Sequence, residues 1–215
     1  MTQQAPPPPP SGITCLFLDI GGVLLSNGWD HHARRRAAEI FGLDWDGMER
    51  RHQANVAAYE EDRLDLDHYL SRVVFNEARP FSREAFWGFM CEQSKPDAGM
   101  LALFSRLKSK YGLKVVAVSN EAKELNAYRI RTFELDRLFD IFISSSFVHV
   151  RKPDIDILKM ALDIAMVAPE QVFYIDNTGE YVDLAADLGI RGHTHTDLPS
   201  TTRMLAALGF DAAEP

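Results

Sequence analysis

The residues of this chain best suited to chemistry lie at the end of its first apolar run. Asp19 follows the run 14–18 and is itself followed by Gly21 and Gly22. Such a run is typical of a parallel strand buried on both faces. The glycines favour an open turn, because glycine tolerates unusual backbone angles and close approach of a ligand. Asp19 is therefore a candidate reactive carboxylate, although an aspartate that merely caps the next element is an equally simple interpretation.

Three further polar clusters end or follow later apolar runs. They are Ser119-Asn120, Arg151-Lys152-Pro153-Asp154 and Asp176-Asn177. In open α/β sheets, ligands bind at the edge formed by the carboxyl ends of the strands. With Asp19, these clusters would bring a carboxylate, a hydroxyl, a lysine and an Asp-Asn pair to one edge. Taken singly, Ser119 could simply begin a helix, Lys152 could be a solvated lysine, and Asp176 could be an acidic residue at a helix start.

The rest of the pattern predicts the sheet that would position these clusters. The expected strands are 14–18, 113–118, 141–143, 172–175 and a weaker 191–195. Helical patterns are expected at 100–111, 123–133, 155–165, 181–188 and 200–208. Strands that alternate with helices predict a parallel sheet covered on both faces. We therefore expect an α/β fold with a doubly wound, Rossmann-like core.

The stretch between the first two strands is far longer than a simple crossover needs. Its helical patterns are 30–41, 46–61, 66–76 and 82–93. An insertion at this point would hang over the carboxyl edge of the sheet as a lid that excludes water and selects substrates. We therefore expect an α/β core formed by 13–25 and 97–215, with a helical cap over 26–96.

Composition excludes several classes of protein. The chain of 215 residues carries a net charge of −8, which argues against a nucleic-acid partner because such a partner needs a basic surface. No apolar run is long enough to span a membrane. Cys15 and Cys91 fall in a predicted strand and a predicted helix, so we expect buried thiols in a reducing, cytoplasmic compartment. Residues 1–12, with prolines at 6–10, are expected to form a disordered tail with polyproline II character and no secretory signal.

The four clusters, in this order, resemble the haloacid dehalogenase-like (HAD) hydrolase superfamily. The resemblance rests on Phe17-Leu18-Asp19-Ile20-Gly21-Gly22-Val23-Leu24, Val118-Ser119-Asn120, Arg151-Lys152-Pro153-Asp154 and Asp176-Asn177. It covers nearly everything after residue 12, and the position of the insertion is similar to that of the helical C1 cap of subfamily I. The sequences of these motifs are most similar to those of bacterial sugar-phosphate phosphatases and of the N-terminal phosphatase domain of soluble epoxide hydrolases.

The resemblance implies a role for each cluster. Asp19 would be the nucleophile, attacking phosphorus to give an aspartyl-phosphate. Ser119 and Asn120 would bind the substrate, Ser119 through a phosphoryl oxygen, and Lys152 would offset negative charge on Asp19 and the phosphate.

A magnesium ion is also implied. Mg²⁺ would be held by Asp19, by the backbone carbonyl of Gly21 and by the pair Asp176 and Asn177, since this ion prefers oxygen ligands. Which member of the pair touches the ion directly is left open at this stage.

Two positions depart from the family pattern. Most phosphatases of the superfamily carry a second aspartate, a general acid/base, where this chain has Gly21. Such catalysis is typically worth roughly 10²–10⁴-fold, so turnover of alkyl phosphates should be poor. Asn177 replaces a common acidic residue, which should weaken metal binding. A cap residue among Asp30, His31 and His32 could supply the missing proton, or the substrate could have a good leaving group.

These considerations predict a hydrolase that removes phosphate from small phosphorylated metabolites. The alternative is a catalytically weakened protein that binds phosphate esters, and a less favoured one is a 2-haloacid dehalogenase. Dehalogenases of the superfamily share a Ser-Asn pair like Ser119-Asn120, but they usually have tyrosine at the position of Gly21 and lack the acidic residue at Asp176. Of the adjacent Arg34, Arg35 and Arg36, at most two could face a substrate. No oligomeric state is predicted.

Overall fold

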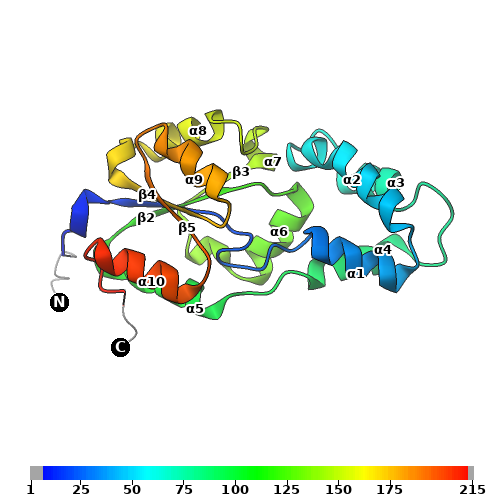
Figure 1. Ribbon diagram of the computed structural model, residues 1–215, viewed down its shortest axis with the longest axis horizontal. Helices are drawn as coiled ribbons and strands as arrows, with labels where there is room; N and C mark the ends of the chain where they lie inside the picture. Colours follow the sequence, from blue (N-terminus) through cyan, green and yellow to red (C-terminus); the bar gives the residue numbers. More distant parts are fainter. Residues whose placement is uncertain (1–6, 213–215) are drawn as a thin grey trace.

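A computed structural model describes residues 7–212 and has one five-stranded, all-parallel sheet in the order β3-β2-β1-β4-β5 (Figure 1). The strands are β1 (Cys15–Leu18), β2 (Lys114–Ser119), β3 (Ile141–Ser144), β4 (Val172–Asp176) and β5 (Arg191–Thr194). Cys15 pairs with Lys114 on one side and with Val172 on the other, so β1 is the central strand. The predicted α/β fold with a doubly wound core is confirmed.

The two faces of the sheet are covered by different helices. Alternate residues of β1 point to opposite faces: Leu16 and Leu18 belong to one buried cluster, Cys15 and Phe17 to another. The first cluster includes residues of α5 (Ala98–Tyr111) and α10 (Leu198–Ala207), and the second includes residues of α8 (Asp156–Ala165) and α9 (Gly179–Ala186). Two further helices are α6 (Lys123–Thr132) and the short α7 (Ser145–Val148). Because both faces are buried, only the strand ends are free to carry a site.

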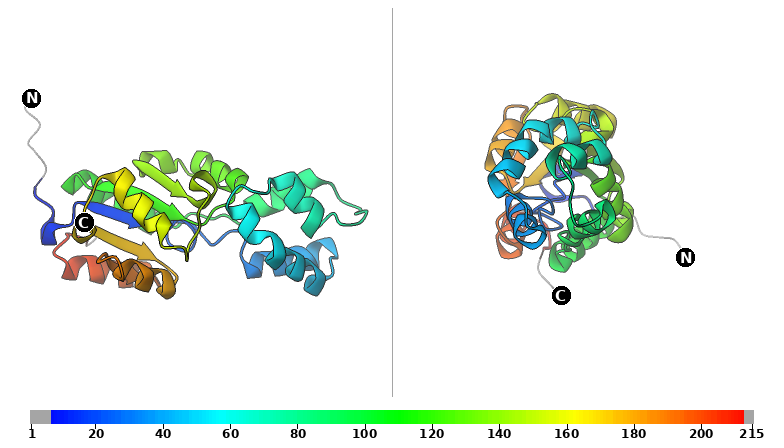
Figure 2. Two further views of the ribbon diagram at one scale, coloured as in Figure 1. Left: turned by 90° about the horizontal axis from the view of Figure 1, so that it is seen from above. Right: turned by 90° about the vertical axis from the view of Figure 1, so that its right-hand side faces the viewer.

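Four helices pack together beyond the carboxyl end of the sheet (Figure 2). They are α1 (His31–Phe41), α2 (Trp45–Glu60), α3 (Leu66–Val73) and α4 (Arg83–Glu92). Each begins at a side-chain cap that accepts a backbone N–H; the capping residues are Asp30, Asp44, Asp65 and Ser82. The chain enters and leaves this bundle side by side, where the Ser26 N–H donates to the Lys95 carbonyl (2.8 Å). The bundle has its own buried core, which also takes in Leu125 of α6.

The N-terminal segment differs from the sequence-based expectation. The expected disordered tail over 1–12 lies partly outside the described residues, but Pro10–Gly12 form a 3₁₀ turn. This turn is held because the Ser11 hydroxyl donates to the Leu208 carbonyl (2.6 Å) and Arg191 donates to the Ser11 carbonyl (2.9 Å). The expectation is therefore wrong for residues 10–12. In the described part of the chain, no helix has both the length and the apolar character needed to cross a membrane.

Candidate active site

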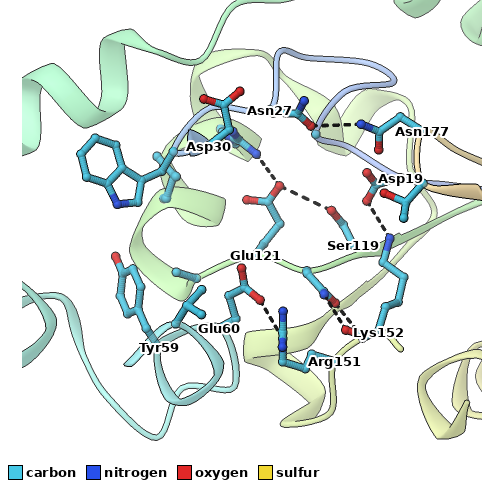
Figure 3. A pocket seen from close by; sticks show the side chains of 18 of the residues that line it. Asp19, Asn27, Asp30, Tyr59, Glu60, Ser119, Glu121, Arg151, Lys152 and Asn177 are labelled. Carbon is cyan, nitrogen blue, oxygen red and sulfur yellow. Dashed lines mark hydrogen bonds and ion pairs between the residues drawn. The ribbon is translucent and has the colours of Figure 1, made fainter. Parts of the chain in front are cut away.

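A pocket of about 290 Å³ lies between the carboxyl edge of the sheet and the four-helix bundle (Figure 3). From the sheet side it is lined by residues that include Asp19, Gly21, Ser119, Lys152 and Asn177. From the bundle side its lining includes Trp29, Asp30, Arg34, Tyr59 and Glu60. The structure thus brings segments far apart in sequence to a single cavity at the predicted edge.

Asp19 lies directly after the central strand, where its backbone N–H donates to the Ile175 carbonyl of β4 (2.9 Å). Its side chain faces the pocket, yet the residue is only 7% exposed. Burial raises the pKa of Asp19 to about 6, Lys152 opposes this shift, and the neighbouring Asp176 adds to it. The Ser119 hydroxyl hydrogen-bonds this carboxylate and lowers its pKa. Asp19 is therefore a desolvated carboxylate at a ligand-accessible strand end.

The Lys152 ammonium lies between two carboxylates. Its Nζ donates to Asp19 Oδ1 (3.0 Å), Asp176 Oδ2 (2.6 Å) and the Val118 carbonyl (3.0 Å). These three partners use the three protons of an ammonium group. Burial alone would lower the pKa of Lys152, but the two carboxylates and Tyr174 raise it well above its usual value. Lys152 is therefore a fixed cation beside the candidate nucleophile.

Asn120 holds the segment that carries this lysine. Its Nδ2 donates to the Lys152 carbonyl (2.9 Å), and its Oδ1 accepts from the Lys152 N–H (2.8 Å). The substrate-binding role expected for Asn120 stays a prediction, and the geometry gives its side chain a positioning role instead.

Asp176 and Asn177 are adjacent in sequence but occupy different places. Asp176 is fully buried, and its carboxylate accepts from Lys152, from the Tyr174 hydroxyl and from the Thr178 N–H (2.8 Å). Asn177 lines the pocket, and its Nδ2 donates to Asn27 Oδ1 (3.2 Å). Asn177 thus faces the pocket while Asp176 lies behind it, buttressing Lys152.

The backbone of the first cluster fits closely against this asparagine pair. Gly22 has φ +78°, and a Cβ there would collide with the Asn177 amide. Only glycine accommodates both the backbone angle and the close approach. Asp19, Gly21 and Asn177 all line the pocket, and they carry a carboxylate, a main-chain carbonyl and a side-chain amide oxygen, respectively. Oxygen donors of this kind suit a hard, oxygen-preferring cation. Within residues 7–212 no group of three or more His, Cys, Asp or Glu side chains is arranged to hold a metal.

A buried ion pair beside Gly21 is the main feature that the sequence did not reveal. Glu121 and Arg129 form a salt bridge and are 3% and 2% exposed, respectively. Glu121 Oε1 also lies 3.4 Å from the Ser119 hydroxyl, and a Cβ at Gly21 would lie 3.7 Å from Arg129 Nη1. The available signal was weak: Glu121 directly follows Ser119-Asn120, but the position of Arg129 depends on the packing of α6.

The bundle side of the pocket carries paired charges. Arg34 donates to both oxygens of Glu49 (2.7 and 2.8 Å), and Arg151 donates to Glu60 (2.8 Å). Arg34 is buried, unlike its neighbours Arg35 and Arg36, as expected for three consecutive residues on a helix.

The expected alternative proton donors are not all at the site. His31 and His32 are exposed and do not line the pocket. Asp30 does line it, but its Oδ1 accepts from the Ala33 N–H (2.7 Å) as the cap of α1. The structure therefore places only Asp30 of this set near the candidate nucleophile.

Solved structures share this fold. A HAD family enzyme from Bacteroides thetaiotaomicron, crystallised with magnesium and inorganic phosphate, aligns with a TM-score of 0.73 and 19% identity over 86% of this chain and 94% of its own. The L-2-haloacid dehalogenase of Xanthobacter autotrophicus aligns with a TM-score of 0.60 and 17% identity over 91% of this chain and 83% of its own. At these identities the similarity is one of fold.

Sequence comparisons give the family. The phosphorylated carbohydrates phosphatase of Thermotoga maritima is 27% identical over 125 residues, which is 58% of this chain and 53% of that protein. The match thus spans about half the length of this relative. The family model described as haloacid dehalogenase-like hydrolase matches residues 13–189, which include all four polar clusters. The resemblance inferred from these clusters is confirmed, and the chain belongs to the haloacid dehalogenase-like hydrolase family.

Proposed function

We propose that this hydrolase is a Mg²⁺-dependent phosphatase of small phosphorylated metabolites that works through an aspartyl-phosphate on Asp19. The observation that carries the proposal is the contact between Asp19 and Lys152 at the floor of the pocket. A carboxylate that attacks a phosphate must overcome the repulsion between two anions, and a fixed ammonium beside it reduces that repulsion.

The first chemical step would be attack by a carboxylate oxygen of Asp19 on phosphorus. The new bond joins Asp19 to phosphorus, and the bond to the leaving oxygen breaks. Ser119 would donate its hydroxyl to a phosphoryl oxygen, and Lys152 would stay close to the charge that moves from Asp19 to the phosphoryl group. Water then attacks phosphorus, inorganic phosphate leaves, and the carboxylate returns.

The proposed Mg²⁺ ligands are the pocket-facing oxygens of Asp19, Asn177 and the Gly21 carbonyl. Asp176 is fully buried and already accepts hydrogen bonds from Lys152 and Tyr174, so we assign it the role of orienting Lys152. When bound, Mg²⁺ would neutralise charge on the phosphoryl group. An acidic residue at position 177 would place a second carboxylate on the metal. Asn177 offers only a neutral amide oxygen, so we expect weak Mg²⁺ binding. The magnesium bound to the Bacteroides relative is consistent with such a site.

The pocket supports a small polar substrate. Its bundle side presents charged pairs and the aromatic side chains of Trp29 and Tyr59, and the Tyr59 hydroxyl is buried without a hydrogen-bond partner among the described residues. The name of the Thermotoga relative is in keeping with phosphorylated carbohydrates as substrates.

Gly21 favours a second candidate function, a weakened protein that binds phosphate esters. At this position an aspartate would supply general acid/base catalysis, typically worth roughly 10²–10⁴-fold. The two candidates differ in one measurable respect, which is whether phosphate is released at a rate that depends on Asp19.

The experiment is phosphate release from sugar phosphates, acyl phosphates and p-nitrophenyl phosphate, with Mg²⁺ and with EDTA. The control is Asp19→Asn, which keeps the side-chain shape but removes the nucleophile. We expect turnover that needs Mg²⁺ and falls to background in Asp19→Asn. Equal release by wild type and Asp19→Asn on every substrate, together with retained binding of phosphate esters, would favour the binding protein.

A further inference from the structure

The buried pair Glu121–Arg129 occupies the part of the pocket next to Gly21. We propose that Glu121 is the general base that activates water for hydrolysis of the aspartyl-phosphate on Asp19. This inference rests on the proposed phosphatase function and assigns a residue to its second step. It does not assign Glu121 to the first step.

The position of Glu121 comes from two independent contacts. Its Oε1 accepts a hydrogen bond from the Ser119 hydroxyl (3.4 Å), and Ser119 lies close enough to Asp19 to lower the pKa of that carboxyl. Arg129, its partner, lies against Gly21, because a Cβ there would be 3.7 Å from Nη1. Glu121 is therefore one hydroxyl away from the nucleophile, on the side of the pocket where an aspartate at position 21 would project.

One oxygen of Glu121 is free for water. Both contacts of the carboxylate are made by Oε1, and Oε2 accepts no hydrogen bond from any described residue. Glu121 lines the pocket, and Figure 3 shows its carboxylate pointing into the cavity between Asp19 and Tyr59. A water that donates a proton to Oε2 would therefore sit inside the pocket rather than in bulk solvent.

The ion pair favours a base over an acid. The Arg129 guanidinium donates to the Glu121 carboxylate, and this charged hydrogen bond favours the ionised form of the glutamate. Burial opposes this and raises the pKa of Glu121, with a smaller contribution from Glu60, so the ionised group is a stronger base than an exposed glutamate. The raised basicity and the guanidinium partner together suit a carboxylate that accepts a proton from water.

The balance of the step is simple. Water oxygen forms a bond to phosphorus, the bond between phosphorus and Asp19 breaks, and the water proton moves to Glu121 Oε2. The proton then leaves to solvent with the product. Because an ionised Glu121 cannot protonate the leaving oxygen in the first step, substrates with acidic leaving groups, such as acyl or aryl phosphates, should react best.

The test is rapid-mixing kinetics of Glu121→Gln with p-nitrophenyl phosphate. We expect a burst of about one p-nitrophenol per active site followed by steady-state turnover at least about 10²-fold below wild type. Acid-quenched protein should carry one phosphoryl group on Asp19. Turnover within a few-fold of wild type would overturn the assignment. So would equal loss of the burst and of the steady state, since that result means Glu121 only positions other groups.

Two further variants make the test specific. Glu60→Gln removes another pocket-lining carboxylate that is paired with an arginine, although Glu60 is only half-buried, and it should not accumulate phosphorylated protein. If Glu121→Gln does not fold because Arg129 loses its partner, the double variant Glu121→Gln/Arg129→Gln removes both charges and should still show the burst. Failure of wild type to release phosphate in an Asp19-dependent way would overturn the proposed function itself, whereas loss of the burst alone overturns only the role of Glu121.

Discussion

The two sides of the pocket differ in how their buried charges are balanced. On the sheet side, Glu121 and Arg129 balance each other, but the single ammonium of Lys152 serves two carboxylates, Asp19 and Asp176. On the bundle side, two glutamates each have their own guanidinium: Glu49 pairs with Arg34, and Glu60 pairs with Arg151.

This difference indicates what each side does. Paired buried charges hold a shape, because removal of one partner leaves an uncompensated charge. An excess of buried negative charge costs stability, and groups with strongly shifted pKa values occur preferentially at functional sites. The raised pKa of Asp19, caused first by burial, marks the sheet side as the reactive one, whereas the bundle side acts as a preformed wall.

Among the variants that test this comparison, Gly21→Asp is expected to change catalytic activity most. The added Cβ would make ordinary van der Waals contact with Arg129 Nη1 (3.7 Å), so the backbone at this position tolerates a side chain. If a missing general acid limits turnover of alkyl phosphates, kcat/KM for these substrates should rise by roughly 10²–10⁴-fold relative to p-nitrophenyl phosphate. Gly21→Asn is the matched control, because it has the same shape and no exchangeable acid proton. An equal change in both variants would show that proton donation does not limit the reaction.

Lys152→Met should remove the charge balance on the sheet side of the pocket. The thioether fills the same volume but leaves Asp19 and Asp176 without their shared cation. We expect kcat/KM to fall by about 10²–10³-fold, the usual cost of removing one preorganised charge-stabilising donor. Steady-state kinetics with p-nitrophenyl phosphate measures this. Lys159→Met, at an exposed lysine paired with Asp156, is the control and should leave kcat/KM unchanged.

Stability should respond in opposite directions on the two sides. The pKa of Asp19 is about 6 in the folded protein against 3.8 in a model peptide, so the folded state binds this proton more tightly. Stability from that proton is therefore present below pH 3.8 and is lost as pH rises through about 6. Without added metal, Asp19→Asn should raise the free energy of unfolding by about 1–3 kcal/mol above pH 6.

Glu49→Gln supplies the contrast on the bundle side. The substitution removes the charged partner of the buried Arg34 side chain. It should lower the free energy of unfolding by about 1–3 kcal/mol. Urea unfolding at neutral pH measures both variants in one series. If Asp19→Asn and Glu49→Gln both lowered the free energy of unfolding, the buried charges of the two sides would contribute to stability in the same way. The comparison would then have no basis.

The sequence predicted the sheet side better than the bundle side for a physical reason. Asp19, Ser119, Lys152 and Asp176 each follow an apolar run, and the ends of parallel strands must meet at one edge. Their convergence thus depended only on local signals and on the topology of the sheet.

Glu121 and Arg129 carried no such signal. They form a pair only because α6 turns the Arg129 side chain toward Gly21 and Gly28. Similarly, the contact of Asn27 with Asn177 joins residues far apart in sequence, and no local pattern indicated it. The wall formed by the bundle depends on which face of each helix is buried, and three consecutive arginines do not reveal that Arg34 is the buried one.

The effect expected to be smallest at neutral pH concerns a buried neutral network in the bundle wall. Trp29 Nε1 donates to the Tyr69 hydroxyl (2.8 Å), so that hydroxyl donates its own proton to His52 Nδ1 (2.7 Å). His52 must therefore be neutral, and burial, with a smaller contribution from Arg34, lowers its pKa to about 3. Between about pH 3 and pH 6.5 the unfolded state binds a proton that the folded state does not, so stability is lost as pH falls below 6.5.

His52→Asn separates this titration from packing. The Asn amide oxygen lies close to the position of Nδ1 and can still accept from Tyr69, but it cannot be protonated in this range. In wild type His52 should contribute a slope of about 1.4 kcal/mol per pH unit to the free energy of unfolding in mild acid. The variant should lose that slope, although it starts from a lower stability at neutral pH because the smaller side chain packs less well. Urea unfolding at a series of pH values measures both slopes. Parallel curves for wild type and variant would mean that His52 is protonated in the folded protein. That result would contradict the hydrogen-bond directions assigned to Trp29 and Tyr69.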